Sequence, residues 1–104
     1  MTAVDHQQID ARLLRLVAAV FRRIERDATL RVRLAENLAR WPDERARARW
    51  AALLRLPWPE FRARLLADTP EGAALRQEAP LGGLLPAEER TRLMREFAHD
   101  PRAA

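Results

Sequence analysis

The sequence predicts an all-α protein: a compact, single-domain bundle of about five to six short helices in which the first helix is the longest. Three observations support this fold class. Apolar residues recur at steps of three and four over most of the chain, as they do along one face of a helix. No stretch alternates apolar and polar residues over the length of a strand. Prolines stand at or just before several expected helix starts, where a fixed φ angle and a missing N–H group are tolerated.

The length and the termini set further limits. A chain of 104 residues suits one domain, so we treat residues 1–104 as a single helical domain and expect residues 1–4 and 99–104 to be frayed. The first residues lack the basic-then-apolar order of a secretory signal, and no apolar run is long enough to span a membrane. We therefore expect a soluble, cytoplasmic protein that does not bind membranes.

Residues 5–26 are predicted to form the first helix, around which the rest of the chain is organised. Asp5 suits the N-cap position, and Gln8 follows at the spacing of a capping box. One broad face of this helix is apolar and must be buried. Its members are Ile9, Leu13, Leu16, Val17, Val20, Phe21 and Ile24.

The opposite side of the same helix carries a basic strip with the small Ala19 near its middle. No acidic residue lies within the strip. Its members are Arg12, Arg15, Arg22, Arg23 and Arg26. Elsewhere, acid-to-arginine pairs at a spacing of four residues predict ordinary solvated helix faces. These pairs are Asp27–Arg31, Glu36–Arg40, Asp43–Arg47, Glu60–Arg64 and Glu88–Arg92. We predict that the strip is the partner-binding surface; the alternative is a solvated outer face.

The second helix is predicted to run from the Asp27-Ala28-Thr29 cap to Trp41, before Pro42. No glycine or proline separates it from the first helix, so one long helix over residues 5–41 is an alternative. The choice depends on whether the Asp27 carboxylate caps a new helix or pairs with Arg31, four residues on.

Four further helices follow, each delimited by proline. The third is predicted to begin at Pro42 or Asp43 and to end before Pro57. The fourth begins at Pro59, and the fifth follows the opening Thr69-Pro70-Glu71. The last is opened by Pro86 and closed by His99-Asp100-Pro101.

The segment between the last two helices, residues 80–86, is apolar and has no helical order. Two interpretations remain open. It is either a second docking loop, since exposed apolar segments mark partner sites, or a plug whose leucines close the end of the bundle. The residues concerned are Leu81, Gly82, Gly83, Leu84 and Leu85.

The composition argues against enzyme catalysis. The chain has no serine, cysteine, tyrosine or lysine, so the usual nucleophiles and thiolate metal sites are absent. Glu96 and His99 have the spacing of two ligands on one helix face, but the second copy that a di-iron site needs is missing. We expect no enzyme activity, no metal and no cofactor. All 19 basic residues are arginine, a pattern that also fits a bacterial-like, G- and C-rich genome.

The three tryptophans, Trp41, Trp50 and Trp58, are predicted to pack in the core and at its corners rather than to stack on nucleic-acid bases. DNA reading by a helix-turn-helix is disfavoured, because Asp43 and Glu44 would place two acids at the start of the recognition helix, against the phosphates.

The sequence thus favours a non-enzymatic, regulatory protein-interaction module, such as an adaptor, inhibitor or antitoxin-type partner. It would dock on an acidic protein surface through the arginine strip. The net charge of +4 is consistent with this, because residues 1–55 carry +5 and residues 56–104 carry −1. The alternative is a nucleic-acid-binding protein that uses the same arginines on the phosphate backbone. A homo-oligomer remains open.

Overall fold

The computed structural model describes residues 6–99, with side chains from residue 9 onward. This part of the chain contains six helices and no strand, and the first helix is the longest, so the predicted all-α fold is confirmed. Apart from His99, the predicted frayed ends lie outside the described residues, as does the Asp5 cap. The helices are α1 (His6–Arg26), α2 (Thr29–Ala39), α3 (Glu44–Leu54), α4 (Trp58–Leu66), α5 (Pro70–Glu78) and α6 (Ala87–Ala98).

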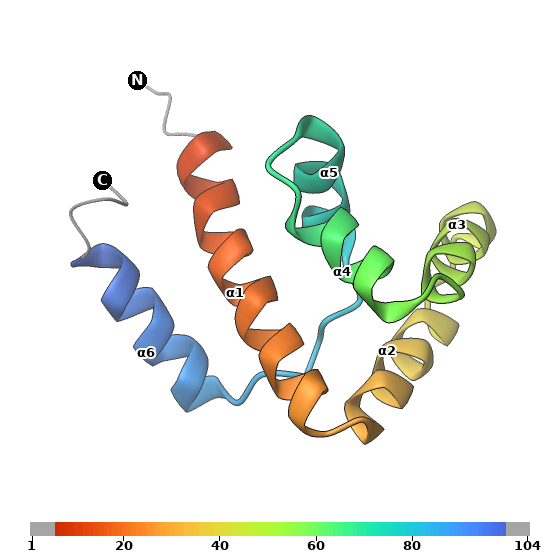
Figure 1. Ribbon diagram of the computed structural model, residues 1–104, viewed down its shortest axis with the longest axis horizontal. Helices are drawn as coiled ribbons and strands as arrows, with labels where there is room; N and C mark the ends of the chain where they lie inside the picture. The colour runs from red at the N-terminus through yellow and green to blue at the C-terminus, as the bar shows by residue number, and fades with distance from the viewer. Residues whose placement is uncertain (1–5, 100–104) are drawn as a thin grey trace.

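The helix α1 crosses the middle of the molecule (Figure 1). The helices α4 and α5 pack on one side of it, and α6 packs on the other. The helices α2 and α3 pair with each other beyond α4. None of the described helices is long and apolar enough to cross a membrane.

The first two helices are separate, which excludes the alternative of one long helix. The helix α1 ends at Arg26, and the Asp27 carboxylate accepts hydrogen bonds from the backbone N–H and the hydroxyl of Thr29, at 3.1 and 2.6 Å. These two bonds lower the pKa of Asp27. Asp27 therefore opens α2 rather than pairing with Arg31, since such a side-chain bond satisfies a backbone donor that the helix itself leaves unpaired.

Most predicted boundaries agree with the structure to within two residues. Asp43 caps α3 by accepting from two backbone N–H groups, and the Thr69 hydroxyl accepts from Gly72 N–H at 3.0 Å to cap α5. The helix α4 starts at Trp58, one residue before the predicted Pro59, because the carbonyl of Pro57 already accepts the first helical hydrogen bonds.

The core is built on the apolar face of α1. Val17, Val20, Phe21 and Ile24 are buried, whereas Ile9 in the first turns is 49% exposed. The buried residues contact the aromatic rings of α3 and α4, and further leucines complete the cluster. Leu13 and Leu16 are half-buried, so the predicted apolar face is fully buried only from Val17 onward.

The three tryptophans form one connected cluster with Phe21 and Phe61, in the core as predicted. The Phe21 ring lies 5.2 Å from Trp58 and 5.8 Å from Phe61, centroid to centroid, and Trp50 packs edge-on against both Phe61 and Trp41. Trp50 is fully buried, and its indole N–H donates to Glu78 at 3.2 Å. Packing of this kind stabilises the core beyond the burial of apolar area.

A buried arginine joins the start of α1 to the α4–α5 hairpin. The Arg76 side chain is 0% exposed, and its Nε and Nη2 donate to the carboxylate of Asp10 at 2.9 and 2.6 Å. Its Nη1 donates to the carbonyls of Leu65 and Ala67, both at 2.8 Å. The hairpin is tight here, since a Cβ on Gly72 would lie 2.3 Å from the Ala67 oxygen. Arg76 thus satisfies carbonyls that the end of α4 leaves unpaired.

The predicted four-residue ion pairs do not form within residues 9–99. Asp27 bonds instead to Thr29 at the start of α2, and Asp43 caps α3. Most of the ion pairs that do form join different helices. Glu36 pairs instead with Arg33 on its own helix, three residues before it. The acids that reach arginines of other helices are not those of the predicted pairs. The pairs between helices are Asp10–Arg76, Glu25–Arg62, Arg49–Glu78 and Arg23–Glu89.

Candidate functional site

The arginine strip of α1 is only partly open, because α6 packs beside α1 (Figure 1) and contacts three of the five arginines. Ala19, in the middle of the strip, is only 2% exposed. A small side chain at this position allows the two helices to approach closely. The strip therefore has a partner within the same chain.

Three arginines of the strip contact α6. The guanidinium groups of Arg12 and Arg15 lie over the ring of Phe97, at 5.7 and 4.9 Å from its centroid. Arg23 pairs with Glu89 through a single contact of 3.4 Å. The Nε atom of Arg23 is buried, yet no acceptor for it lies among the described residues. Cation–π contacts and one long ion pair thus hold α6 on this side.

The other two members, Arg22 and Arg26, are exposed and make no ion pair within the described part of the chain. They lie one turn apart near the C-terminal end of α1. The role of all five arginines in binding a partner stays a prediction.

The leucines of the predicted docking loop face the core. Leu84 is 1% exposed, and Leu81 and Leu85 pack partly buried against the core, so the leucines close the bundle as the plug interpretation proposed. Only Gly82 and Gly83 are exposed, and Gly83 has a φ angle of 75° that favours glycine.

The path of this loop is fixed by a residue that the sequence did not single out. The side-chain amide of Asn37 in α2 donates to the carbonyls of Pro80 and Gly82, both at 2.9 Å. Asparagine suits this task, because its amide carries two donors.

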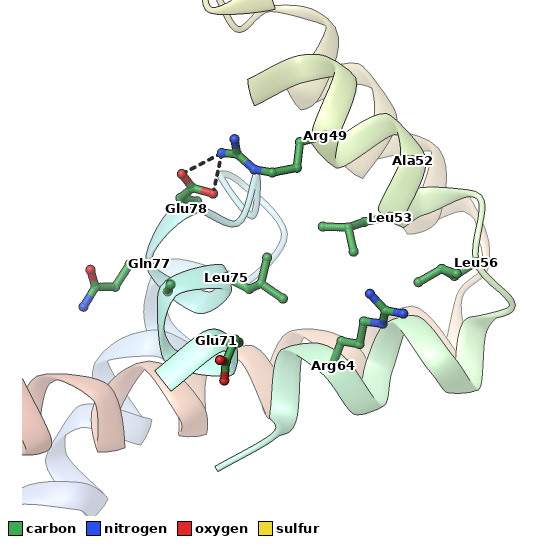
Figure 2. Close-up of a pocket in the computed structure, with 10 residues that line it drawn as sticks. Arg49, Ala52, Leu53, Leu56, Arg64, Glu71, Leu75, Gln77 and Glu78 are labelled. Carbon is green, nitrogen blue, oxygen red and sulfur yellow. Dashed lines mark hydrogen bonds and ion pairs between the residues drawn. The ribbon is translucent and has the colours of Figure 1, made fainter. Parts of the chain in front are cut away.

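A groove of about 890 Å³ lies between α3 and the α4–α5 hairpin (Figure 2). Leu53 and Leu56 point into it from the end of α3 and the following turn, and Leu75 points into it from α5. Leu53 is buried, whereas Leu56 and Leu75 are half-buried. The floor of the groove is therefore apolar and partly open to solvent.

Four charged side chains surround this floor. At one end, Arg49 donates to both carboxylate oxygens of Glu78 at 2.9 Å. Hydrogen bonds from Trp50 and from Arg49 lower the pKa of Glu78. At the other end, Arg64 and Glu71 make no hydrogen bond or ion pair within residues 9–99. Figure 2 shows the Arg64 guanidinium rising from α4 toward the leucines.

Sequence reasoning missed this groove. It assigned Arg64 to a pair with Glu60 and gave Arg49 and Glu78 no role, because residues 29 positions apart have no visible relation before the helices are packed. The apolar signal was weak too, since leucines at the ends of short helices are expected in any core.

No three histidine, cysteine, aspartate or glutamate side chains in the described part of the chain lie close enough to hold a metal ion. Glu96 and His99 are both exposed on α6. The expectation that the protein works without metal or cofactor stays a prediction.

No family model, curated protein or solved structure matches this chain. Function therefore has to be inferred from the side chains themselves.

Proposed function

We propose that this chain is a non-enzymatic protein-interaction module, and that its groove between α3 and the α4–α5 hairpin binds an amphipathic, carboxylate-bearing segment of another protein. The observation that carries the proposal is the combination of an open leucine floor with Arg64, an arginine that makes no hydrogen bond or ion pair within residues 9–99.

The floor supplies the apolar part of such an interface. Leu53, Leu56 and Leu75 come from both walls of the groove, so an apolar side chain inserted between them would contact all three (Figure 2). Binding energy in protein interfaces is concentrated in central apolar pockets of this kind, with charged groups at the rim. A helix that lays its apolar face into a groove is a common mode of peptide recognition.

The rim supplies the preference for an acid. Arg49 is already held in place by Glu78, so its charge is partly compensated. Arg64 is exposed, and its guanidinium group lies beside the leucines rather than beside an acid (Figure 2). A carboxylate one helical turn from the partner's apolar residues would pair with Arg64 in a charge-assisted, bidentate geometry. The sequence predicted an acidic partner for the arginine strip; the charge of Arg64 supports a partner of the same chemistry for this groove.

A labelled synthetic helix with a leucine stripe and one glutamate beside it tests the proposal by fluorescence anisotropy. A second peptide carries glutamine in place of that glutamate. We expect the native chain to bind the glutamate peptide about tenfold more tightly, because a hydrogen bond to a charged group is lost in the glutamine peptide. In Arg64→Gln this preference should disappear.

Arg55→Gln is the matched control, since Arg55 is an exposed arginine that ends α3 and does not line the groove. It should keep the preference for glutamate. Equal binding of both peptides to the native chain would contradict the proposal. Binding of single-stranded RNA that weakens steeply with salt and is unchanged in Arg64→Gln would favour the nucleic-acid alternative instead.

A further inference from the structure

A second binding surface lies beneath α6, on residues different from those of the groove. We infer that the arginine strip of α1 is a docking surface for a helix with an acidic first turn and an aromatic residue two turns later, and that a partner helix of this kind replaces α6 there.

The side chains expected on the partner helix are inferred from the contacts that α6 makes with α1. Glu89, Leu93 and Phe97 follow one another at steps of four residues and share the face that meets α1. Glu89 pairs with Arg23, and Phe97 lies beneath the guanidinium groups of Arg12 and Arg15. The strip therefore selects a carboxylate near the start of a helix and a ring two turns on.

The present occupant fits imperfectly at its acidic end. Glu89 reaches Arg23 through one contact of 3.4 Å, and the buried Nε of Arg23 has no acceptor within the described residues. A guanidinium group binds a carboxylate best when two N–H groups point at its two oxygens. A buried donor without a partner costs free energy, so a helix whose carboxylate reaches both nitrogens would bind the strip better than α6 does.

The helix α6 is also separable from the rest of the molecule. It packs chiefly against α1 (Figure 1), and none of its described residues belongs to the main core cluster. Phe97 is buried, but apart from that cluster. When α6 leaves, the aromatic and leucine core formed by the other five helices stays in place.

In the intact chain α6 competes for the strip with the advantage of a short covalent connection. A tethered competitor acts at an effective concentration in the millimolar range. A free helix therefore binds weakly until the contact between α6 and α1 is weakened, and the apparent affinity rises with the fraction of molecules in which the strip is open.

The test uses the full-length chain and a labelled peptide with the sequence of residues 87–99. Glu89→Arg replaces the attractive contact with Arg23 by a repulsive one, and Phe97→Ala removes the ring beneath Arg12 and Arg15. Each variant should bind the unaltered peptide at least about tenfold more tightly than the native chain does. A peptide that itself carries both substitutions should not bind.

Glu96→Arg is the matched control, because Glu96 is exposed on α6 and makes no ion pair in the described part of the chain. Glu96→Arg makes the same change of charge as Glu89→Arg, but this variant should bind the peptide as weakly as the native chain does. Near-UV circular dichroism of the tryptophans should be unchanged in Glu89→Arg. The inference is overturned if neither variant gains affinity, if the doubly substituted peptide binds equally well, or if weakening α6 abolishes the tryptophan signal.

Discussion

The two sides of α1 are both covered, but by different physical interactions. Toward α4, the helix presents Val17, Val20, Phe21 and Ile24, which are almost completely removed from water. Toward α6, it presents arginines that meet one aromatic ring and one carboxylate, around the small Ala19. The first side is held by apolar burial, which scales with area and is not screened by salt. The second is held by contacts that solvent and salt weaken. One helix thus carries a permanent interface, held by apolar burial, and a second interface that we infer to be exchangeable.

The largest expected effect comes from breaking the permanent side. Val20→Asp places an unpaired charge at a position that is 3% exposed, so we expect a loss of more than about 4 kcal/mol and no cooperative thermal transition. Val32→Asp is the control, because Val32 is 58% exposed on α2. A cooperative melting curve for Val20→Asp, followed by circular dichroism, would mean that this side is not the core.

A smaller effect is expected at the polar link between α1 and the α4–α5 hairpin. Arg76→Met removes a side chain that is 0% exposed, and it leaves Asp10 and two carbonyls without their donor. We expect a loss of about 3 kcal/mol in urea-induced unfolding. The control Arg62→Met breaks the exposed pair with Glu25 and should cost less than about 1 kcal/mol. Equal losses in the two variants would show that the buried link has no special role.

The smallest effects are expected on the exchangeable side. Arg15→Gln removes a cation–π contact to Phe97 and should cost about 0.5–1 kcal/mol, whereas Arg22→Gln should stay within about 0.5 kcal/mol, because Arg22 is exposed without an ion pair in the described residues. Urea unfolding measures both. If Arg15→Gln lowered the free energy of unfolding as much as Arg76→Met does, the packing of α6 on α1 would be as strong as the core side. The difference between the two sides of α1 would then be contradicted.

Local features of the sequence were sufficient to predict the helices, but not to predict which helices pack against one another. Prolines and caps such as Asp43 and Thr69 act within a few residues, so their consequences are visible before folding. The spacing of the arginines predicted that they share one side of α1. The angular positions of residues around a helix do not predict which other helix packs on that side. Ala19 was the available signal, since a small residue amid long ones favours close helix packing.

The groove and the buried arginine depend on tertiary packing, which short-range patterns do not carry. Arg76 lies in a short helix whose sequence does not predict a buried arginine. Its acceptors, the Asp10 carboxylate and the Leu65 carbonyl, come from α1 and from the end of α4. Arg64 was expected to pair with Glu60, because the four-residue rule describes isolated helices and takes no account of the neighbours that a fold supplies.

The two hydrogen bonds from the Asn37 amide limit how far α6 can travel. They hold the chain to α2 as far as Gly82, and Leu84, which is 1% exposed, holds the loop in the core. Only residues 85 and 86 remain as a flexible connection, with a reach of about 7 Å when extended. A helix on so short a connection stays close to α1. In the inferred exchange, α6 would therefore rebind as soon as a competing helix dissociates. Exchange at this surface would therefore be rapid and self-resetting, without any refolding of the core.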